Sequence, residues 1–136
     1  MDLSNLETNI NFEHDGVWVD LEDADKTLLL IARIGNPRYN SRMRARMKTQ
    51  QYALKMKELS IEAQEAIVTE VISETVLLDW KNLKYKGKAI KYSPTRAFEI
   101  MTQIKDFRNL VVEIADDMET FKIVSQEEDS KNSKAS

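Results

Sequence analysis

The chain has 136 residues, of which 42% are hydrophobic and 32% charged, with a formal net charge of −3. That length favours one domain with a modest core, and the content of only three glycines and two prolines favours helices over a turn-rich sandwich. The absence of cysteine excludes disulfide and thiolate chemistry, and no apolar run approaches the ~20 residues of a membrane-spanning helix.

The charged residues fall into blocks of alternating sign. Residues 1–25 hold eight acids and no lysine or arginine, and residues 26–57 hold nine basic residues and no acid. Residues 58–79 then hold six acids and no base, and residues 80–92 hold five lysines and no acid. Such blocks can attract one another within a molecule or between copies, or they can simply be solvated faces.

A β-hairpin is predicted near the N-terminus. Residues 1–12 show no periodicity and are expected to be flexible, so one structured domain is expected over residues 13–124. The stretches GVWVDL from Gly16 and TLLLIARI from Thr27 each predict a strand, with polar turn residues between them. One hairpin is marginally stable alone, so it must pack against other elements.

Two helices are expected next. Asn36 is a good N-cap and Pro37 is tolerated at a first helical position, so a helix is predicted to begin there. Tyr39, Met43 and Met47 lie near one face and are expected to face the core. A second helix is predicted to begin after a cap at Ser60. It is predicted to extend to residue 80, because apolar residues recur at helical spacing over that range.

A short basic ribbon, residues 81–92, follows this helix and is predicted to turn at Gly87. Trp80 is expected to be a mostly buried anchor where the helix meets the ribbon. Ser93 and Pro94 predict another capped helix, and Asp106 is expected to cap a last one. Residues 125–136 are expected to be a disordered tail. The predicted fold class is α+β, mostly α-helical, with the hairpin packed on about four helices.

The sequence offers little for catalysis. His14 is the only histidine, and general acid–base chemistry needs a positioned partner that neighbours in sequence do not supply. No phosphate-binding glycine loop, nucleophile elbow or spaced metal-ligand pattern occurs. We therefore expect no enzyme activity, no cofactor and no metal.

The basic helix leaves two binding hypotheses open. Its arginines could contact phosphates of a nucleic acid, although the sequence pI of about 5.3 and a neighbouring glutamate-rich helix count against this. Its methionines and tyrosines could instead accommodate a helical protein partner. The candidate partner-binding residues are Arg42, Arg44, Arg46, Met47, Tyr52 and Met56. The expected structural anchors are Pro37, Tyr39, Trp80, Gly87, Tyr92 and Pro94.

Across residues 12–121 the order of these signals resembles that of the tail assembly chaperones of long-tailed bacteriophages. The resemblance is carried by Ile31-Ala32-Arg33, Asn36-Pro37-Arg38-Tyr39, Asp79-Trp80 and Gly87-Lys88-Ala89-Ile90-Lys91-Tyr92-Ser93. Two features depart from the pattern: Arg96 stands where an acidic residue is common, and the ribbon is unusually rich in lysine.

The resemblance implies a protein made in the host cytoplasm and absent from, or minor in, the finished virion. Members of that family coat the tape-measure protein and keep it soluble while the tail tube polymerises around it. The implied partners are the tape-measure protein and further copies of the chain, with the tail tube protein as another candidate. Neither a membrane nor a nucleic acid is an implied partner.

Overall fold

The computed structural model describes residues 1–56 and 59–122, with the side chains of residues 1–49 and 59–122. Its helices are η1 (Leu3–Leu6), α1 (Ile10–Asp15), α2 (Pro37–Met56), α3 (Ile61–Thr75), α4 (Pro94–Gln103), α5 (Lys105–Asp116) and η2 (Met118–Phe121), where η marks a 3-10 helix. Its strands are β1 (Val17–Asp20), β2 (Leu28–Ile31), β3 (Leu77–Lys81), β4 (Lys84–Tyr85) and β5 (Lys88–Ala89). The fold is α+β and mostly helical, as the sequence predicts.

The predicted N-terminal hairpin is confirmed. β1 and β2 pair antiparallel, with Val17 opposite Ile31 and Trp18 opposite Leu30. Side chains alternate between the two faces of a strand, and Leu29 and Ile31 are accordingly fully buried while Leu30, between them, is partly exposed. The hairpin therefore offers one apolar face to the core.

The helix predicted to reach residue 80 ends earlier, at Thr75, so its predicted C-terminal end is wrong. Residues Leu77–Lys81 instead form β3, which pairs antiparallel with β2 and completes a sheet of order β1-β2-β3. The amide of Ala32 donates to the carbonyl oxygen of Val76 at 2.8 Å where helix gives way to strand. β2 is the central strand, and β3 satisfies the backbone groups on its second edge. A short apolar run such as VLL suits a buried strand as well as a helix.

Three predicted helix starts are confirmed. The side-chain oxygens of Asn36, Ser60 and Ser93 each accept a hydrogen bond from the backbone amide three residues later, at 3.0–3.1 Å. The prediction that Asp106 caps the last helix is wrong, because Ile104 is both the C-cap residue of α4 and the N-cap residue of α5. Asp106 lies in the first turn of α5, where a negative charge still favours the helix dipole.

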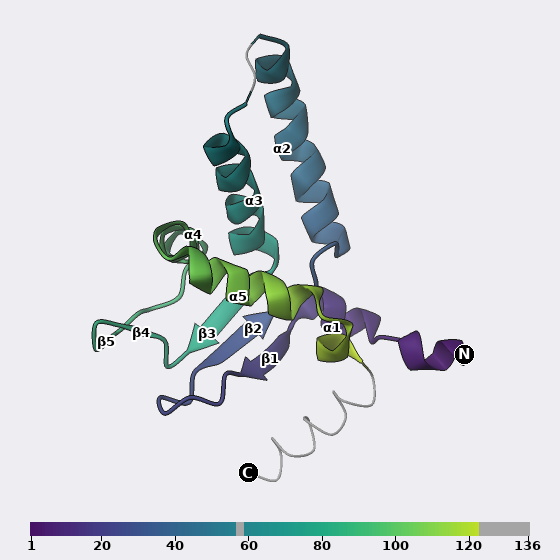
Figure 1. Ribbon diagram of the computed structural model, residues 1–136, viewed down its shortest axis with the longest axis vertical. Helices are drawn as coiled ribbons and strands as arrows, with labels where there is room; N and C mark the ends of the chain where they lie inside the picture. The colour runs from purple at the N-terminus through teal and green to yellow at the C-terminus, as the bar shows by residue number, and fades with distance from the viewer. Residues whose placement is uncertain (57–58, 123–136) are drawn as a thin grey trace.

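The hydrophobic core lies between the three-stranded sheet and helices α3, α4 and α5. Figure 1 shows α5 crossing the sheet, while α2 and α3 rise side by side away from it. We call α2 and α3 the helical arm. The buried core residues are Leu29, Ile31, Ile72, Val76, Leu77, Trp80, Ala97, Ile100, Met101, Val111 and Ala115.

The N-terminal segment contains two short helices, η1 and α1, that the sequence did not predict. Thr8 forms an isolated antiparallel bridge with Lys122, and the amide of Asn9 donates to the carbonyl oxygen of Phe121 at 2.8 Å. The flexibility expected of residues 1–12 and the domain limits of 13–124 stay predictions. The predicted disordered tail, residues 125–136, lies outside the described residues.

Candidate protein-binding site

Asn36 joins the two helices of the arm at their base and is only 3% exposed. Its Nδ2 donates to the carbonyl oxygens of Arg33 at 2.7 Å and Thr75 at 3.2 Å, while its Oδ1 caps α2. Because Thr75 is the last residue of α3, one buried amide links the start of α2 to the end of α3. The expected anchor Pro37 is the first residue of α2, and the chain enters and leaves the arm at nearly the same point.

Two of the predicted partner-binding arginines are paired with α3. Arg42 Nε lies 2.6 Å from Glu74 Oε2, and Arg46 Nη2 lies 2.9 Å from Glu70 Oε2. The hydrogen bond to Glu74 and the negative charges beside it raise the pKa of the Arg42 guanidinium. The basic block of α2 and the acidic block of α3 thus neutralise each other in part within one molecule.

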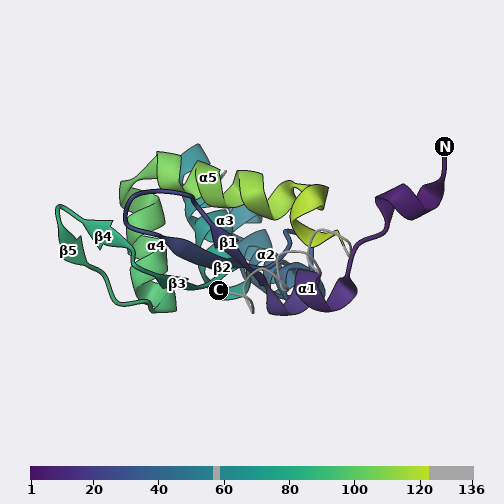
Figure 2. The same cartoon turned by 90° about the horizontal axis from the view of Figure 1, so that it is seen from below.

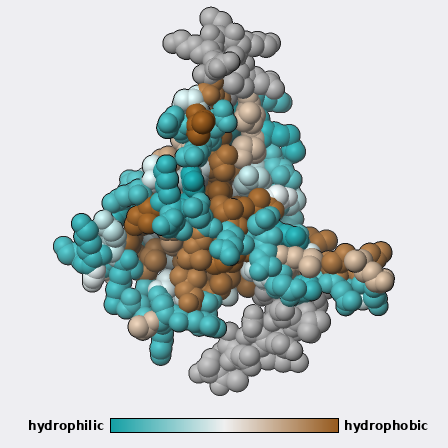
Figure 3. All heavy atoms as spheres, viewed as in Figure 1, coloured by the Kyte–Doolittle hydropathy of each residue, from teal (hydrophilic) through white to brown (hydrophobic). Residues whose placement is uncertain are grey.

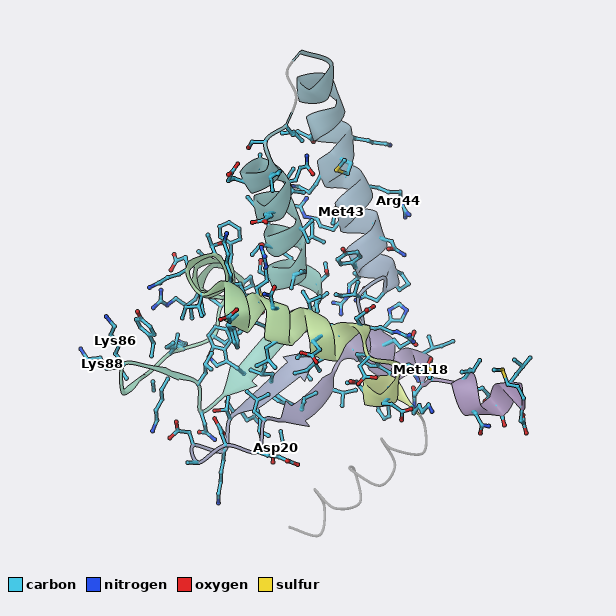
Figure 4. The ribbon with its side chains drawn as sticks, viewed as in Figure 1. Asp20, Met43, Arg44, Lys86, Lys88 and Met118 are labelled. Carbon is cyan, nitrogen blue, oxygen red and sulfur yellow. The ribbon has the colours of Figure 1, made fainter. Side chains whose placement is uncertain are left out.

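The other candidate residues on α2 differ in position. Arg44 is exposed on the side of α2 away from α3, and no ion pair involves it within the described residues (Figure 4). Met47 is 39% exposed, so the expectation that it faces the core is wrong. The part of α2 that carries Met47 lies beyond the core, because α2 projects away from the sheet. Tyr39 and Met43 are half-buried, and Tyr39 packs against the core. The side chains of the remaining candidates, Tyr52 and Met56, lie outside the described residues.

Exposed apolar side chains lie on both helices of the arm. Met47 on α2 and Ile61 and Val68 on α3 are 39%, 71% and 38% exposed. Figure 3 shows hydrophobic atoms along the arm among polar ones. The sequence analysis identified neither Ile61 nor Val68 as a contact residue. The available signal was that α3 carries apolar residues on more than one face, which indicates a contact surface in addition to the core-facing one.

Trp80 is a buried anchor, as predicted, although it stands on a strand. It is 5% exposed, and its Nε1 donates to the carbonyl oxygen of Ile90 at 2.7 Å. Its ring packs edge-on against Tyr92, with 4.9 Å between ring centroids. The Tyr92 hydroxyl donates to the carbonyl oxygen of Leu77 at 2.7 Å, and burial, with a smaller effect of the Asp79 charge, raises the pKa of Tyr92 to about 12. These contacts hold the far end of the ribbon against β3.

The predicted turn at Gly87 is confirmed. β4 and β5 pair antiparallel, and the two residues between them, Lys86 and Gly87, have φ angles of 49° and 79°. Positive φ at both positions is the requirement of the two-residue turns that fit the twist of a hairpin. The ribbon therefore projects as a lysine-rich hairpin, with Lys86 and Lys88 near its tip (Figure 4). The last expected anchor, Pro94, opens α4 just after the ribbon.

A groove lies between the ribbon and helices α4 and α5. It has a volume of about 230 Å³ and a mainly apolar lining that includes Leu83, Ile90, Ile104 and Phe107. Arg96 and Ile90 also line a second, wider hollow that adjoins the groove, together with Lys88 and Lys91. We call the 230 Å³ cavity the ribbon groove. No local sequence pattern predicts this groove, because it forms only where α4 and α5 pack beside the ribbon.

Within the described residues, no three metal-ligating side chains come together, and no helix combines the length and apolar character needed to span a membrane. Residues 34–132 match the sequence model of a protein family described as YdaY prophage protein. The matched range includes the arm, β3, the ribbon, α4 and α5. No curated protein and no solved structure significantly matches the chain.

Proposed function

Because the chain belongs to the YdaY prophage protein family, we propose that it serves phage morphogenesis as a tail assembly chaperone. In this role it binds the tape-measure protein and keeps it soluble in the host cytoplasm while the tail tube assembles. It acts through protein contacts and self-association rather than catalysis, and it is absent from the mature virion. The assignment as a tail assembly chaperone is supported by the sequence resemblance to such chaperones, which includes the strand before Asn36-Pro37, the Asn-Pro pair itself and the Asp79-Trp80 pair.

The observation that carries the proposal is the helical arm. It projects from the sheet, and exposed Met47, Ile61 and Val68 give its two helices apolar side chains in contact with water. An amphipathic helix binds by laying its apolar face on such a surface, and methionine adapts to partners of varied sequence. A tape-measure protein is a long helical chain whose exposed apolar stripe would otherwise aggregate.

The rival function is nucleic-acid binding through the basic helix at residues 38–57. The pairing of Arg42 and Arg46 with α3 glutamates weighs against it, because those guanidinium groups already have carboxylate partners. Among the described residues, Arg44 and Lys48 on α2 and the exposed lysines of the ribbon still offer charge for phosphate contacts. Binding of that kind would weaken steeply with rising salt concentration.

Co-expression with a fragment of the tape-measure protein from the same prophage tests the proposal. We expect the chain to raise the soluble fraction of the fragment, measured after centrifugation, and to co-purify with it. Met47→Asp combined with Val68→Asp should abolish both effects, because it places charge on both helices of the arm. Ala45→Asp, an exposed change on α2, is the matched control and should retain them.

Two results would contradict the proposal. One is a fragment that stays insoluble with the wild-type chain, and the other is an M47D/V68D variant that works as well as wild type. Fluorescence anisotropy with labelled duplex DNA at several salt concentrations tests the rival. Salt-sensitive binding that Arg44→Glu weakens, together with no effect on the fragment, would favour nucleic acid as the ligand.

A further inference from the structure

The N-terminal segment, residues 1–7, exposes apolar side chains on an acidic background. Met1, Leu3 and Leu6 are 103%, 71% and 48% exposed. The same segment carries Asp2 and Glu7 and contains no lysine or arginine. Figures 1 and 2 both show it extending away from the body of the molecule beyond α1. Three large apolar side chains on a projecting segment need a cover that the chain's own core does not provide.

The ribbon groove has the complementary character. Its floor is apolar, formed in part by Leu83, Ile104 and Phe107, and Arg96 lies at its border with the wider hollow. The ribbon beside it carries five lysines and no acid over residues 80–92. Only one of these lysines forms an ion pair within the described residues, Lys84 with Asp25 at 3.2 Å. The groove, together with the adjoining hollow that Lys88 and Lys91 line, therefore suits an apolar segment with negative charge.

The two features stand at opposite ends of the molecule. In Figure 1 the ribbon lies at the left and the N-terminal segment at the right, and Figure 2 shows the same separation from below. A segment on one side of the body does not reach a groove on the other side of the same copy. It does reach the groove of a second copy placed alongside.

We propose that residues 1–7 of one copy dock into the ribbon groove of a second copy. Leu3 and Leu6 fill the apolar floor, while Asp2 and Glu7 face the ribbon lysines. The contact joins two different surfaces, so each bound copy still offers a free segment and a free groove, and the array grows head to tail. This inference rests on the self-association in the proposed function and names the surfaces that carry it.

Two complementary variants test the proposal by sedimentation velocity over a range of protein concentrations. The segment variant is Leu3→Ser with Leu6→Ser. The groove variant is Lys88→Glu with Lys91→Glu, which reverses the charge of the hollow that adjoins the groove. All four side chains are exposed, so the circular dichroism spectrum should not change. We expect wild type to form concentration-dependent oligomers and each variant to associate about tenfold more weakly.

Mixing the two variants is the decisive step. The groove variant keeps an intact segment and the segment variant keeps an intact groove, so a 1:1 mixture should form a heterodimer that grows no further. The matched control is Arg44→Glu with Lys48→Glu, the same change of charge placed on α2, which should assemble like wild type. A synthetic peptide of residues 1–7 should inhibit wild-type assembly, and its L3S/L6S form should not.

Several outcomes would overturn the proposal: a monomeric wild type, a segment variant that assembles normally, or a mixture that stays monomeric. If wild-type assembly survives both variants, another interface joins the copies. If the groove variant loses binding to a tape-measure fragment or to DNA while wild type is monomeric, the groove holds that ligand instead. A monomeric wild type would also remove self-association from the proposed function, whereas the solubility assay with the M47D/V68D variant tests the arm separately.

Discussion

The helical arm and the ribbon both project from the same core, but they are attached by different kinds of interaction. The ribbon is held through buried aromatic residues, with Trp80 and Tyr92 in contact and each bonded to a backbone carbonyl. In the arm, α3 is packed on the core through buried residues such as Ile72, whereas α2 is joined to α3 at its base by Asn36 and above it by partly exposed arginine–glutamate pairs. Buried aromatic contacts contribute several kcal/mol, whereas exposed ion pairs contribute little. The α2 helix of the arm should therefore be more easily loosened than the ribbon.

Replacing Trp80 by alanine should have the largest effect. The change removes a buried ring and leaves the Ile90 carbonyl without its donor, so we expect a loss of about 3–5 kcal/mol in the free energy of unfolding. Urea titration measures it. Trp18→Ala is the control: Trp18 is 38% exposed and contacts Lys81, and its loss should amount to about 1 kcal/mol. Equal losses from the two changes would show that Trp80 is no anchor.

Asn36→Ala should come next. It removes the cap of α2 and leaves the buried carbonyl of Thr75 unsatisfied, so we expect a loss of about 2–3 kcal/mol in unfolding free energy. Hydrogen exchange should show that protection falls most in the arm. Asn40→Ala, an exposed change in the same helix, should matter much less. A loss of protection spread evenly over sheet and arm would argue against a specific role of Asn36 at the base of the arm.

Tyr92→Phe should cost about 1–2 kcal/mol at neutral pH, because the carbonyl of Leu77 loses its donor. The pKa of Tyr92 is raised from 10 to about 12 in the folded protein, so its neutral form is favoured there. Its contribution is complete below pH 10 and is lost as the pH rises from 10 through about 12. The difference in unfolding free energy between wild type and Y92F should thus shrink over that range, and a constant difference would contradict the assignment.

Arg42→Glu combined with Arg46→Glu should have the smallest effect, about 1 kcal/mol or less, because these pairs are partly exposed. The loss should diminish between about 0.1 M and 1 M salt, as the Debye length falls from ~10 Å to ~3 Å. Adding Glu70→Arg and Glu74→Arg should restore stability. Arg44→Glu is the control and should leave the melting temperature unchanged. A loss above about 3 kcal/mol would mean that the arm depends on these pairs far more than exposure allows.

The elements whose signals are local were predictable from the sequence. Asn36, Ser60 and Ser93 cap helices through their own side chains, and Gly87 permits its turn through its own backbone. β3 was not predictable, because Leu77 and its apolar neighbours fit a helix or a buried strand equally well. The outcome depended on the free edge of β2, which lies far away in sequence.

The candidate site was less accessible to sequence reasoning than the fold. The methionine-bearing helix was identified, but its register against α3 was not encoded locally. That register decides that Arg42 and Arg46 meet glutamates while Arg44 faces away from α3. The ribbon groove likewise arises from packing of α4 and α5, and the exposed apolar segment at residues 1–7 lacked any periodicity that would mark it.

The arm is inserted between two neighbouring strands of one sheet. β2 ends at Ile31 and its antiparallel neighbour β3 begins at Leu77, so the whole arm occupies the position of a hairpin loop. Within α3, it is the lower part that contributes to the core, through residues such as Ile72. The outer part is free to vary in length when both helices gain or lose about seven residues, two turns each, which preserves the facing sides. Related chains can thus change their reach while the sheet remains the same.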